Sequence, residues 1–184
     1  MTTALVILAD GFEEVEAVSV IDILRRAQIE VTVAGMSDVQ VRGAHDILVR
    51  ADVKLSGVGA SLFDAVILPG GEPGTTHLQS GAGGAAVKEI LTRHAHAGKW
   101  LCAICAAPRI LDAWGFLDGR QATSFPGTKP HMTHCHYRED RVVLDGQVIT
   151  SRGPGTALEF AVTIVEKLVS PAARQRLEEA LVMK

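Results

Sequence analysis

The sequence predicts an α/β protein whose mostly parallel sheet is covered by helices on both faces. Short apolar segments bounded by Gly, Pro or charged residues are typical of strands buried on both faces. These segments alternate with segments of helical periodicity, which is the pattern of parallel strands joined by helices. The 184 residues suit one domain, and the chain contains no evident linker, repeat or low-complexity segment. We therefore expect a single domain over residues 1–184.

The expected strands and helices follow one another along the whole chain. Strands are predicted at Ala4–Ala9, Val31–Gly35, Ala65–Leu68 and Trp100–Ile104. Helices are predicted at Val15–Ala27, Ala85–His96, Ala107–Trp114, Thr156–Val169 and Ala172–Leu181. Gly98 is typical of the residue after a helix, Ser170 and Thr156 are typical of helix caps, and Pro171 suits a first helical position.

Two hairpins are expected to interrupt this alternation. Short strand-like pieces around Gly43 and Asp46–Arg50 indicate the first. In Val142–Thr150, the Asp145-Gly146 pair between two apolar triplets indicates a second hairpin with a two-residue turn. The segment Gly81–Gly84 is expected to be a loop.

Charge and composition exclude several classes of protein. The contents of 47% hydrophobic and 21% charged residues exclude a disordered chain. The net charge is −3, and the 18 Lys and Arg residues form no obvious basic face for nucleic acid. Aromatic residues are only 4%, which argues against a platform for stacking single strands. No apolar stretch is long enough to span a bilayer.

The three cysteines, Cys102, Cys105 and Cys135, are too few for a disulfide framework. They favour a reducing compartment, so we expect a cytoplasmic location. The apolar stretch Ala4–Ala9 runs into acidic residues without a basic flank, which is not the pattern of a signal peptide.

Cys105 is the sharpest candidate for chemistry. A buried strand is predicted to end at Cys105 and a helix to begin within two residues, which is the setting of a nucleophile elbow. Ala103, Ala106 and Ala107 supply the small neighbours that such a turn tolerates. Free N–H groups and the dipole at a helix N-terminus favour the thiolate, the reactive form. The alternative is a buried, inert cysteine.

Cys102 and Cys105 also form a C-x-x-C pattern, which we do not interpret as a redox pair. Three residues along a strand span about 10 Å, and the two side chains point to opposite faces. A disulfide needs Cα atoms closer than about 7 Å. Cys102 is therefore predicted to lie in the core.

Glu16 is expected to project from the apolar side of its helix. Val20, Ile23, Leu24 and Ala27 share its face at helical spacing. A buried carboxyl needs a partner or stays protonated, because burial raises its pKa. Near a cysteine, such a group can donate a hydrogen bond to the thiolate or move its proton. The alternative is that the helix begins later and Glu16 is a solvated acid.

Glycines follow the predicted strand Ala65–Leu68. In Gly70-Gly71, backbone N–H groups can approach a ligand and form an oxyanion hole with the N–H of Ala106. A tight turn is the alternative, and the absence of G-x-x-x-x-G-K-[ST] excludes a nucleotide P-loop. The loop Ser151–Thr156 also follows a strand, where ligand crevices form in open α/β sheets.

The segment His131–His136 combines three histidines with Cys135 and raises the question of a zinc site. Its spacings match no standard zinc-binding pattern. We interpret these histidines as solvated loop residues and expect no metal. A metal-binding module centred on His134–His136 is the alternative.

Taken in order, these segments resemble the ThiJ/PfpI superfamily, and within it the branch of the parkinsonism-associated protein deglycase (DJ-one) and the bacterial YajL type. The matching segments span nearly the whole chain: Ala4–Ala9, Glu13–Glu16, Leu68–Gly71, Ala85–Leu91, Ala103–Pro108 and Ser151–Thr156. The resemblance implies a flavodoxin-like three-layer sandwich that forms a homodimer.

The resemblance also implies roles for the candidate residues. Cys105 matches the reactive, oxidation-prone cysteine, and Glu16 matches its partner glutamate. The N–H groups of Gly71 and Ala106 match the oxyanion-binding pair. The implied activities need no cofactor: conversion of methylglyoxal to lactate (glyoxalase III), deglycation of methylglyoxal adducts, chaperoning and sensing of oxidative stress.

The chain departs from its relatives near this cysteine. Ala106 stands where the protease-like branch has a histidine, Phe125 replaces a histidine of the human branch, and His45 replaces an arginine of many relatives. Arg26 does match a dimer-proximal arginine, and Glu16 remains as the evident acid–base group. Two functions follow: a cofactor-free enzyme acting on a small 2-oxoaldehyde, or a redox-sensing chaperone without significant turnover.

Overall fold

The central element is a seven-stranded sheet with the strand order β10-β11-β7-β6-β1-β2-β5. This is a computed structural model, and it describes residues 1–183. The strands are β1 (Thr3–Leu8), β2 (Glu30–Gly35), β5 (Val53–Lys54), β6 (Ala65–Leu68), β7 (Trp100–Ile104), β10 (Val142–Asp145) and β11 (Val148–Ser151). Neighbouring strands pair in parallel, except that β10 and β11 form an antiparallel hairpin at the edge.

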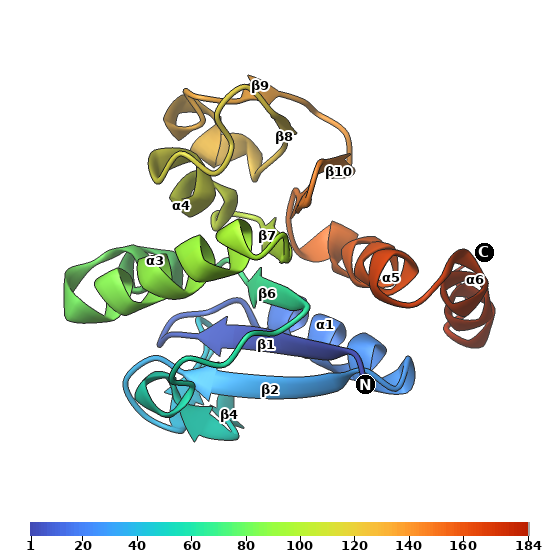
Figure 1. The fold of residues 1–184 in the computed structure, drawn as a ribbon, viewed down its shortest axis with the longest axis horizontal. Helices are drawn as coiled ribbons and strands as arrows, with labels where there is room; N and C mark the ends of the chain where they lie inside the picture. The colour runs from blue at the N-terminus through green and yellow to red at the C-terminus, as the bar shows by residue number, and fades with distance from the viewer. Residues whose placement is uncertain (184) are drawn as a thin grey trace.

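Helices cover both faces of the sheet (Figure 1). They are α1 (Glu14–Arg26), α2 (Gly74–Gln79), α3 (Gly81–His96), α4 (Pro108–Ala113), α5 (Ala157–Leu168) and α6 (Pro171–Ala180). Side chains of α1 and α5 pack with one face of the sheet, and those of α2, α3 and α4 pack with the other, whereas α6 packs against α5. This arrangement confirms the predicted flavodoxin-like α/β sandwich.

Two small sheets lie beside the central one. An antiparallel hairpin joins β3 (Gln40–Arg42) and β4 (Leu48–Arg50), and a parallel pair joins β8 (Gln121–Ala122) and β9 (His136–Tyr137). Short 3-10 turns cover Leu55–Gly57, Pro126–His131 and Pro154–Thr156. Both hairpins expected from the sequence are present, and Gly146 in the second has a φ of 58°.

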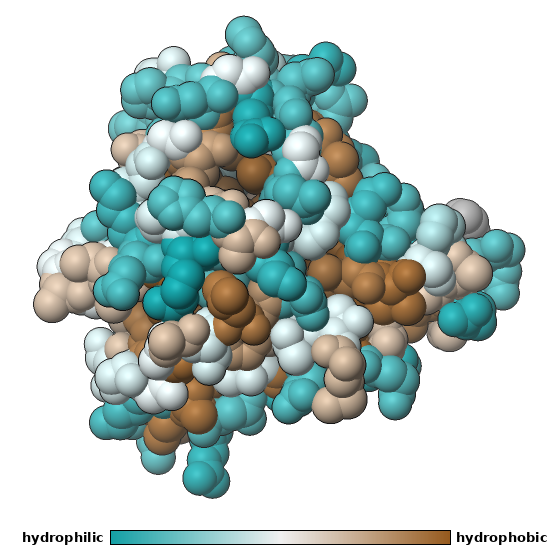
Figure 2. Space-filling model, viewed as in Figure 1, coloured by the Kyte–Doolittle hydropathy of each residue, from teal (hydrophilic) through white to brown (hydrophobic). Residues whose placement is uncertain are grey.

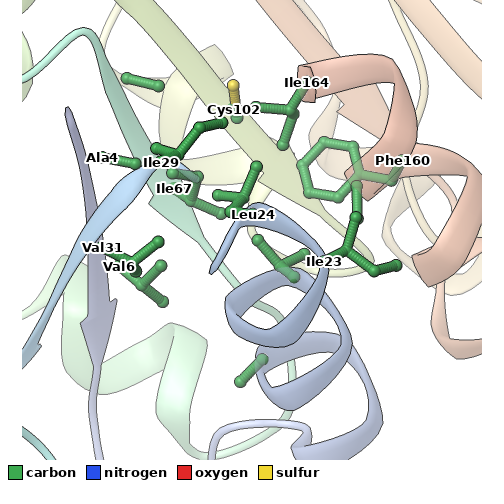
Figure 3. Close-up of a cluster of buried hydrophobic side chains, with 14 of the residues drawn as sticks. Ala4, Val6, Ile23, Leu24, Ile29, Val31, Ile67, Cys102, Phe160 and Ile164 are labelled. Atoms are coloured by element: carbon green, nitrogen blue, oxygen red, sulfur yellow. The ribbon is translucent and has the colours of Figure 1, made fainter. Parts of the chain in front are cut away.

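The strand register places a row of apolar side chains across the sheet. Val6 of β1 is aligned with Ile67 of β6, Ile67 with Cys102 of β7, and Cys102 with Ile149 of β11. In Figure 3, side chains of this row lie beside Ile23 of α1 and residues of α5. Cys102 is 1% exposed, which confirms its predicted place in the core.

Several local predictions require correction. Gly81–Gly84 is not a loop but the first turn of α3, and the preceding helix α2 was not predicted. A Cβ on Gly84 would lie within 2.5–2.7 Å of backbone atoms of Gln79, so the tight turn between the helices leaves no room for a side chain there. Thr156 does not cap α5 with its side chain, because its hydroxyl bonds to Ser151 and Gly153 instead. Ser170 does cap α6 by accepting a hydrogen bond from the Ala173 N–H.

The surface mixes polar and apolar side chains. In the view of Figure 2, apolar side chains gather in a patch over α5, between largely polar regions. Within residues 1–183, no helix is both long enough and apolar enough to cross a membrane.

Candidate active site

Three segments meet at the carboxyl edge of the sheet. Cys105 directly follows β7, Gly70 and Gly71 follow the neighbouring strand β6, and Glu16 lies in the first turn of α1, which follows β1. Because the carboxyl ends of parallel strands share one edge, residues far apart in sequence are brought together there. The structure thus assembles Cys105, Glu16, Gly70 and Gly71, with Ala106 as the residue after the cysteine.

The backbone at Cys105 has a left-handed conformation, with a φ of 64°. Residues with a side chain adopt this conformation rarely, so it must be stabilised by the surroundings. The Cys105 N–H donates to the Ser151 carbonyl at 3.0 Å, and its carbonyl accepts from the Phe125 N–H at 2.7 Å. The end of β11 and the loop containing Phe125 therefore hold the two sides of the turn.

Glu16 is completely buried. Its Oε2 accepts a hydrogen bond from the Gly70 N–H at 2.7 Å, and its carboxyl interacts with the thiol of Cys105. Burial raises the pKa of Glu16 to about 7, although the bonds from Gly70 and Cys105 oppose this shift. The inward orientation expected from the helical spacing is confirmed, and the alternative of a solvated acid is wrong.

The acidity of the Cys105 thiol depends on the charge of Glu16. Burial, followed by the negative charge of an ionised Glu16, raises the pKa of the thiol, whereas the N–H groups of Ala106 and Gly71 lower it. The sequence led us to expect a thiolate stabilised by a helix N-terminus, but burial outweighs the backbone donors when Glu16 is ionised. A thiolate is favoured when the remaining proton of the pair lies on Glu16, which then donates to the sulfur.

Gly70 is in direct contact with both reactive groups. A Cβ at this position would lie 2.5 Å from Cys105 Cβ, 2.9 Å from Glu16 Oε2 and 3.0 Å from the Ala106 nitrogen. Real Cβ atoms essentially never show contacts shorter than 3.0 Å, so Cys105 or Glu16 would have to shift. The close approach of Glu16 and Cys105 therefore requires a glycine at position 70.

Gly153 lies beside the sulfur. A Cβ on Gly153 would be 3.9 Å from Cys105 Sγ and 3.5 Å from the Phe125 ring, so Gly153 borders the reactive atom and the Phe125 ring lies next to Gly153. The sequence had indicated the loop Ser151–Thr156 as part of a ligand crevice, because it follows a strand. Arg26 is at the other end of α1 from Glu16, where it pairs with Asp22 at 2.8 Å, and it does not join this cluster.

His45 lies in the turn between β3 and β4 and packs against the start of α1. Its Nδ1 is 2.9 Å from Glu14 Oε2 and 3.8 Å from Glu13 Oε2. Hydrogen bonding to Glu14 raises the pKa of His45. Burial alone would raise the pKa of Glu14. Hydrogen bonds from His45 and from backbone N–H groups outweigh this effect of burial and lower the pKa of the carboxyl.

Among the residues that the structure describes, the side chains of the histidine-rich segment do not gather into a group of three ligands. Within residues 1–183, the group of three metal-ligating side chains close enough to share a cation is Glu13, Glu14 and His45. His134 instead pairs with buried Asp112 at 3.1 Å. Burial, with Asp112 beside it, raises the pKa of the Cys135 thiol to about 11.

Sequence reasoning missed an ion pair next to the backbone donors. Glu72 Oε1 lies 2.6 Å from an Nη atom of Arg109. Glu72 follows Gly71, and Arg109 lies three residues after Ala106. The sequence did contain a signal for this pair, because Glu72 and Arg109 carry opposite charges and come shortly after the neighbouring strands β6 and β7.

Fold and site together define a flavodoxin-like α/β protein with a cysteine and a carboxyl group at the carboxyl edge of its sheet. Residues 2–167 match the model of the DJ-1/PfpI family. The chain is 41% identical over 186 residues to the Parkinson disease protein 7 homolog of Danio rerio, covering 98% of this chain and 97% of that one. It belongs to the DJ-1/PfpI family, as the sequence segments had led us to expect.

Two further comparisons describe the similarity. The crystal structure of Drosophila melanogaster DJ-1beta has a TM-score of 0.94 and 40% sequence identity, and the match covers 98% of this chain and 97% of that chain. A Caenorhabditis elegans relative named glutathione-independent glyoxalase DJR-1.2 is 37% identical over 182 residues, covering 97% of this chain and 95% of the relative.

Proposed function

We propose that this protein is a cofactor-free, cysteine-dependent enzyme that acts on methylglyoxal and its adducts, as a glyoxalase III or a protein deglycase in the cytoplasm. The observation that carries the proposal is the buried Glu16 carboxyl beside the Cys105 thiol, with the N–H groups of Gly71 and Ala106 directed at the sulfur. The glyoxalase name of the Caenorhabditis elegans relative supports the choice of substrate.

The reaction begins with addition of the Cys105 sulfur to the aldehyde carbon of methylglyoxal. The S–C bond forms, the thiol proton passes to Glu16, and the carbonyl oxygen becomes an oxyanion. The N–H groups of Gly71 and Ala106 stabilise this oxyanion, which then takes the proton from Glu16 to give the neutral hemithioacetal and restores the Glu16 carboxylate.

Glu16 then completes the conversion by moving a proton. Its carboxylate removes the proton from the carbon bound to sulfur and returns a proton to the adjacent carbon, which gives a thioester of lactate. Water breaks the S–C bond, releasing lactate and restoring the thiol. The net change is the addition of one water molecule, so no oxidant, reductant or cofactor is needed.

The test is lactate formation from methylglyoxal by the wild type and by Cys105→Ser and Glu16→Gln. Both variants are expected to lose nearly all turnover, because one lacks the thiol and the other lacks the proton carrier. Cys135→Ser is the matched control, since its thiol lies apart from Glu16 and should be dispensable. Unchanged turnover in Cys105→Ser would exclude the proposed cysteine-dependent activity.

Deglycation needs a separate measurement. Removal of free methylglyoxal lets early adducts reverse by themselves, which imitates repair. We therefore expect true deglycation to persist when a small-molecule scavenger holds free methylglyoxal near zero. If adduct loss then proceeds at the rate seen without protein, the activity is restricted to free aldehyde.

A redox-sensing chaperone is the second candidate. It is favoured by the partial exposure of Cys105 and by the backbone donors and Glu16 around the sulfur, which can hydrogen-bond oxygen atoms added to it. Two equivalents of peroxide oxidise the thiol first to sulfenic and then to sulfinic acid, releasing water. A mass gain of two oxygens at Cys105 together with negligible aldehyde turnover would favour this function.

A further inference from the structure

An ion pair links the two segments that supply the backbone donors at Cys105. Glu72 Oε1 lies 2.6 Å from Arg109 Nη2, and Glu72 Oε2 accepts a hydrogen bond from Thr76 Oγ1 at 2.8 Å. Arg109 Nη2 also donates to the same Thr76 hydroxyl at 3.0 Å. The three side chains close a ring of contacts between the segment after β6 and helix α4 after β7.

The donors lie immediately beside this ring. Gly71 precedes Glu72, and its carbonyl is held by the N–H and the hydroxyl of Thr75 at 2.9 and 2.8 Å. On the other side, the Ala106 carbonyl accepts from the Arg109 N–H at 3.3 Å. A shift of α4 relative to the loop would therefore change the distance between the two N–H groups.

Arg109 is held more firmly than a typical surface arginine. Its side chain is only 20% exposed, and its Nε is buried without a hydrogen-bond partner in the part of the chain that the structure describes. The polar bonds of the guanidinium are concentrated at the Nη end that faces Glu72 and Thr76. This geometry suits a brace, an ion pair that holds helix α4 against the segment after β6.

We propose that Glu72 and Arg109 are positioning residues, whose ion pair holds the N–H groups of Gly71 and Ala106 together at the Cys105 sulfur. The inference rests on the proposed function only in taking Cys105 as the reacting atom. It extends the site to a pair of residues that do not touch the substrate.

The competing explanation is a direct effect of the two charges on the thiolate. Loss of the Arg109 charge would then disfavour the thiolate, whereas loss of the Glu72 charge would favour it. A brace predicts the same direction for both changes, because either change breaks the same ion pair. The sign of the Glu72→Gln effect therefore distinguishes the two explanations.

The experiment measures alkylation of Cys105 by iodoacetamide as a function of pH, with the Cys105 peptide quantified by mass spectrometry. Arg109→Gln and Glu72→Gln are each expected to slow alkylation at neutral pH roughly tenfold, because misplaced donors stabilise the thiolate less. The double variant is expected to be no slower than either single variant, since the second change removes nothing more.

Lys99→Gln supplies the matched control. Lys99 pairs with Asp64 at 2.9 Å, and this pair joins the starts of β7 and β6 at the opposite edge of the sheet. The substituted side chains all reach solvent in part, at 20% for Arg109, 47% for Glu72 and 34% for Lys99, and glutamine keeps much of their bulk, so all of these variants should fold. The control should alkylate at the wild-type rate.

Three results would overturn the proposal: wild-type alkylation in Arg109→Gln, faster alkylation in Glu72→Gln, or an equal loss in Lys99→Gln. Alkylation does not depend on the natural substrate. If both single variants react slowly while the wild type forms no lactate, the brace stands and the proposed enzyme fails. If turnover is measurable, kcat should fall in both variants with little change in KM.

Discussion

At Glu16, burial and hydrogen bonding act in opposite directions on one carboxyl. The side chain is fully buried, and burial raises its pKa to about 7 against the bond from Gly70. The unfolded chain releases this proton near the ordinary value of 4.5. Between these values the folded state holds an extra proton, so its stability must fall as the pH rises.

Glu16→Gln should remove this pH dependence. Relative to the variant, the wild type is expected to lose roughly 3 kcal/mol of unfolding free energy between pH 4.5 and 7, at about 1.4 kcal/mol for each pH unit. Urea denaturation of both proteins at several pH values measures the difference. Parallel stability curves would show that the Glu16 proton is not retained on folding.

Gly70→Ala should damage the site and the fold together. The added methyl group would lie 2.9 Å from Glu16 Oε2 and 3.0 Å from the Ala106 nitrogen. We expect a loss of about 1–3 kcal/mol in stability and a large fall in Cys105 alkylation, because overpacking displaces both neighbours. Gly57→Ala is the control, since its Cβ would meet only Val53 at an ordinary 3.9 Å. A Gly70→Ala protein with wild-type reactivity would refute the close contact.

At the scale of elements, the apolar segments predicted the four central strands well. The predictions for β6 and β7 have the observed bounds, because buried parallel strands are continuous apolar segments. Helix α2 (Gly74–Gln79) shows no apolar periodicity in its sequence. The two-residue strands form because they pair with strands that are distant in sequence. These elements depend on tertiary contacts that local sequence does not carry.

The site was predicted unevenly for the same reason. Cys105 and Glu16 were recognisable from a strand end and from helical spacing. The surroundings of Cys105 depend on segments that are distant in sequence, such as the loop whose Phe125 N–H donates to the Cys105 carbonyl. The pairing of Glu72 with Arg109 likewise joins residues that only the order of β6 and β7 brings together.

The β3–β4 hairpin provides a prediction at this scale. Buried Glu14 accepts the His45 N–H at 2.7 Å and the Ile47 N–H at 3.4 Å, which fastens the hairpin to α1. Glu14→Ala leaves these N–H groups unpaired and should cost about 2 kcal/mol. Hydrogen exchange should speed up in residues 43–47 when measured by mass spectrometry.

His45→Ala is the matched control for this hairpin. The His45 ring is largely exposed, and its removal leaves the two backbone bonds to Glu14 in place. Only a small change in exchange and stability is therefore expected. Equal effects of the two substitutions would assign the fastening to the ion pair rather than to the backbone bonds.

At the scale of the whole molecule, apolar side chains remain exposed close to the site. Val15 and Val18 on α1 are 53% and 48% exposed, and Leu158 on α5 is 44% exposed. Val15 and Leu158 border a groove of about 560 Å³ between these helices. Apolar surface gathered near a site is typical of a contact between proteins. We propose that a second copy of the chain covers this surface.

Val18→Asp should therefore weaken a dimer. A charge buried at the contact would lower the apparent mass towards that of one chain in size-exclusion chromatography with light scattering. Leu62→Asp is the control, because Leu62 is equally exposed but lies before β6, outside this surface. Unchanged mass in Val18→Asp, or a wild type that is already monomeric, would contradict the prediction.

The positions of the three sulfur atoms determine how oxidative damage is repaired. A sulfenic acid is rescued when a second thiol converts it to a disulfide. Cys102 is buried in the core and lies about 10 Å along the strand, beyond the reach of a disulfide. Cys135 packs against the apolar cluster on the other face of the sheet, and burial raises the pKa of its thiol to about 11. Within residues 1–183, neither Cys102 nor Cys135 is placed to resolve a sulfenic acid at Cys105. We therefore expect that, if Cys105 is oxidised, an external thiol such as glutathione has to reach it before a second peroxide makes the change permanent.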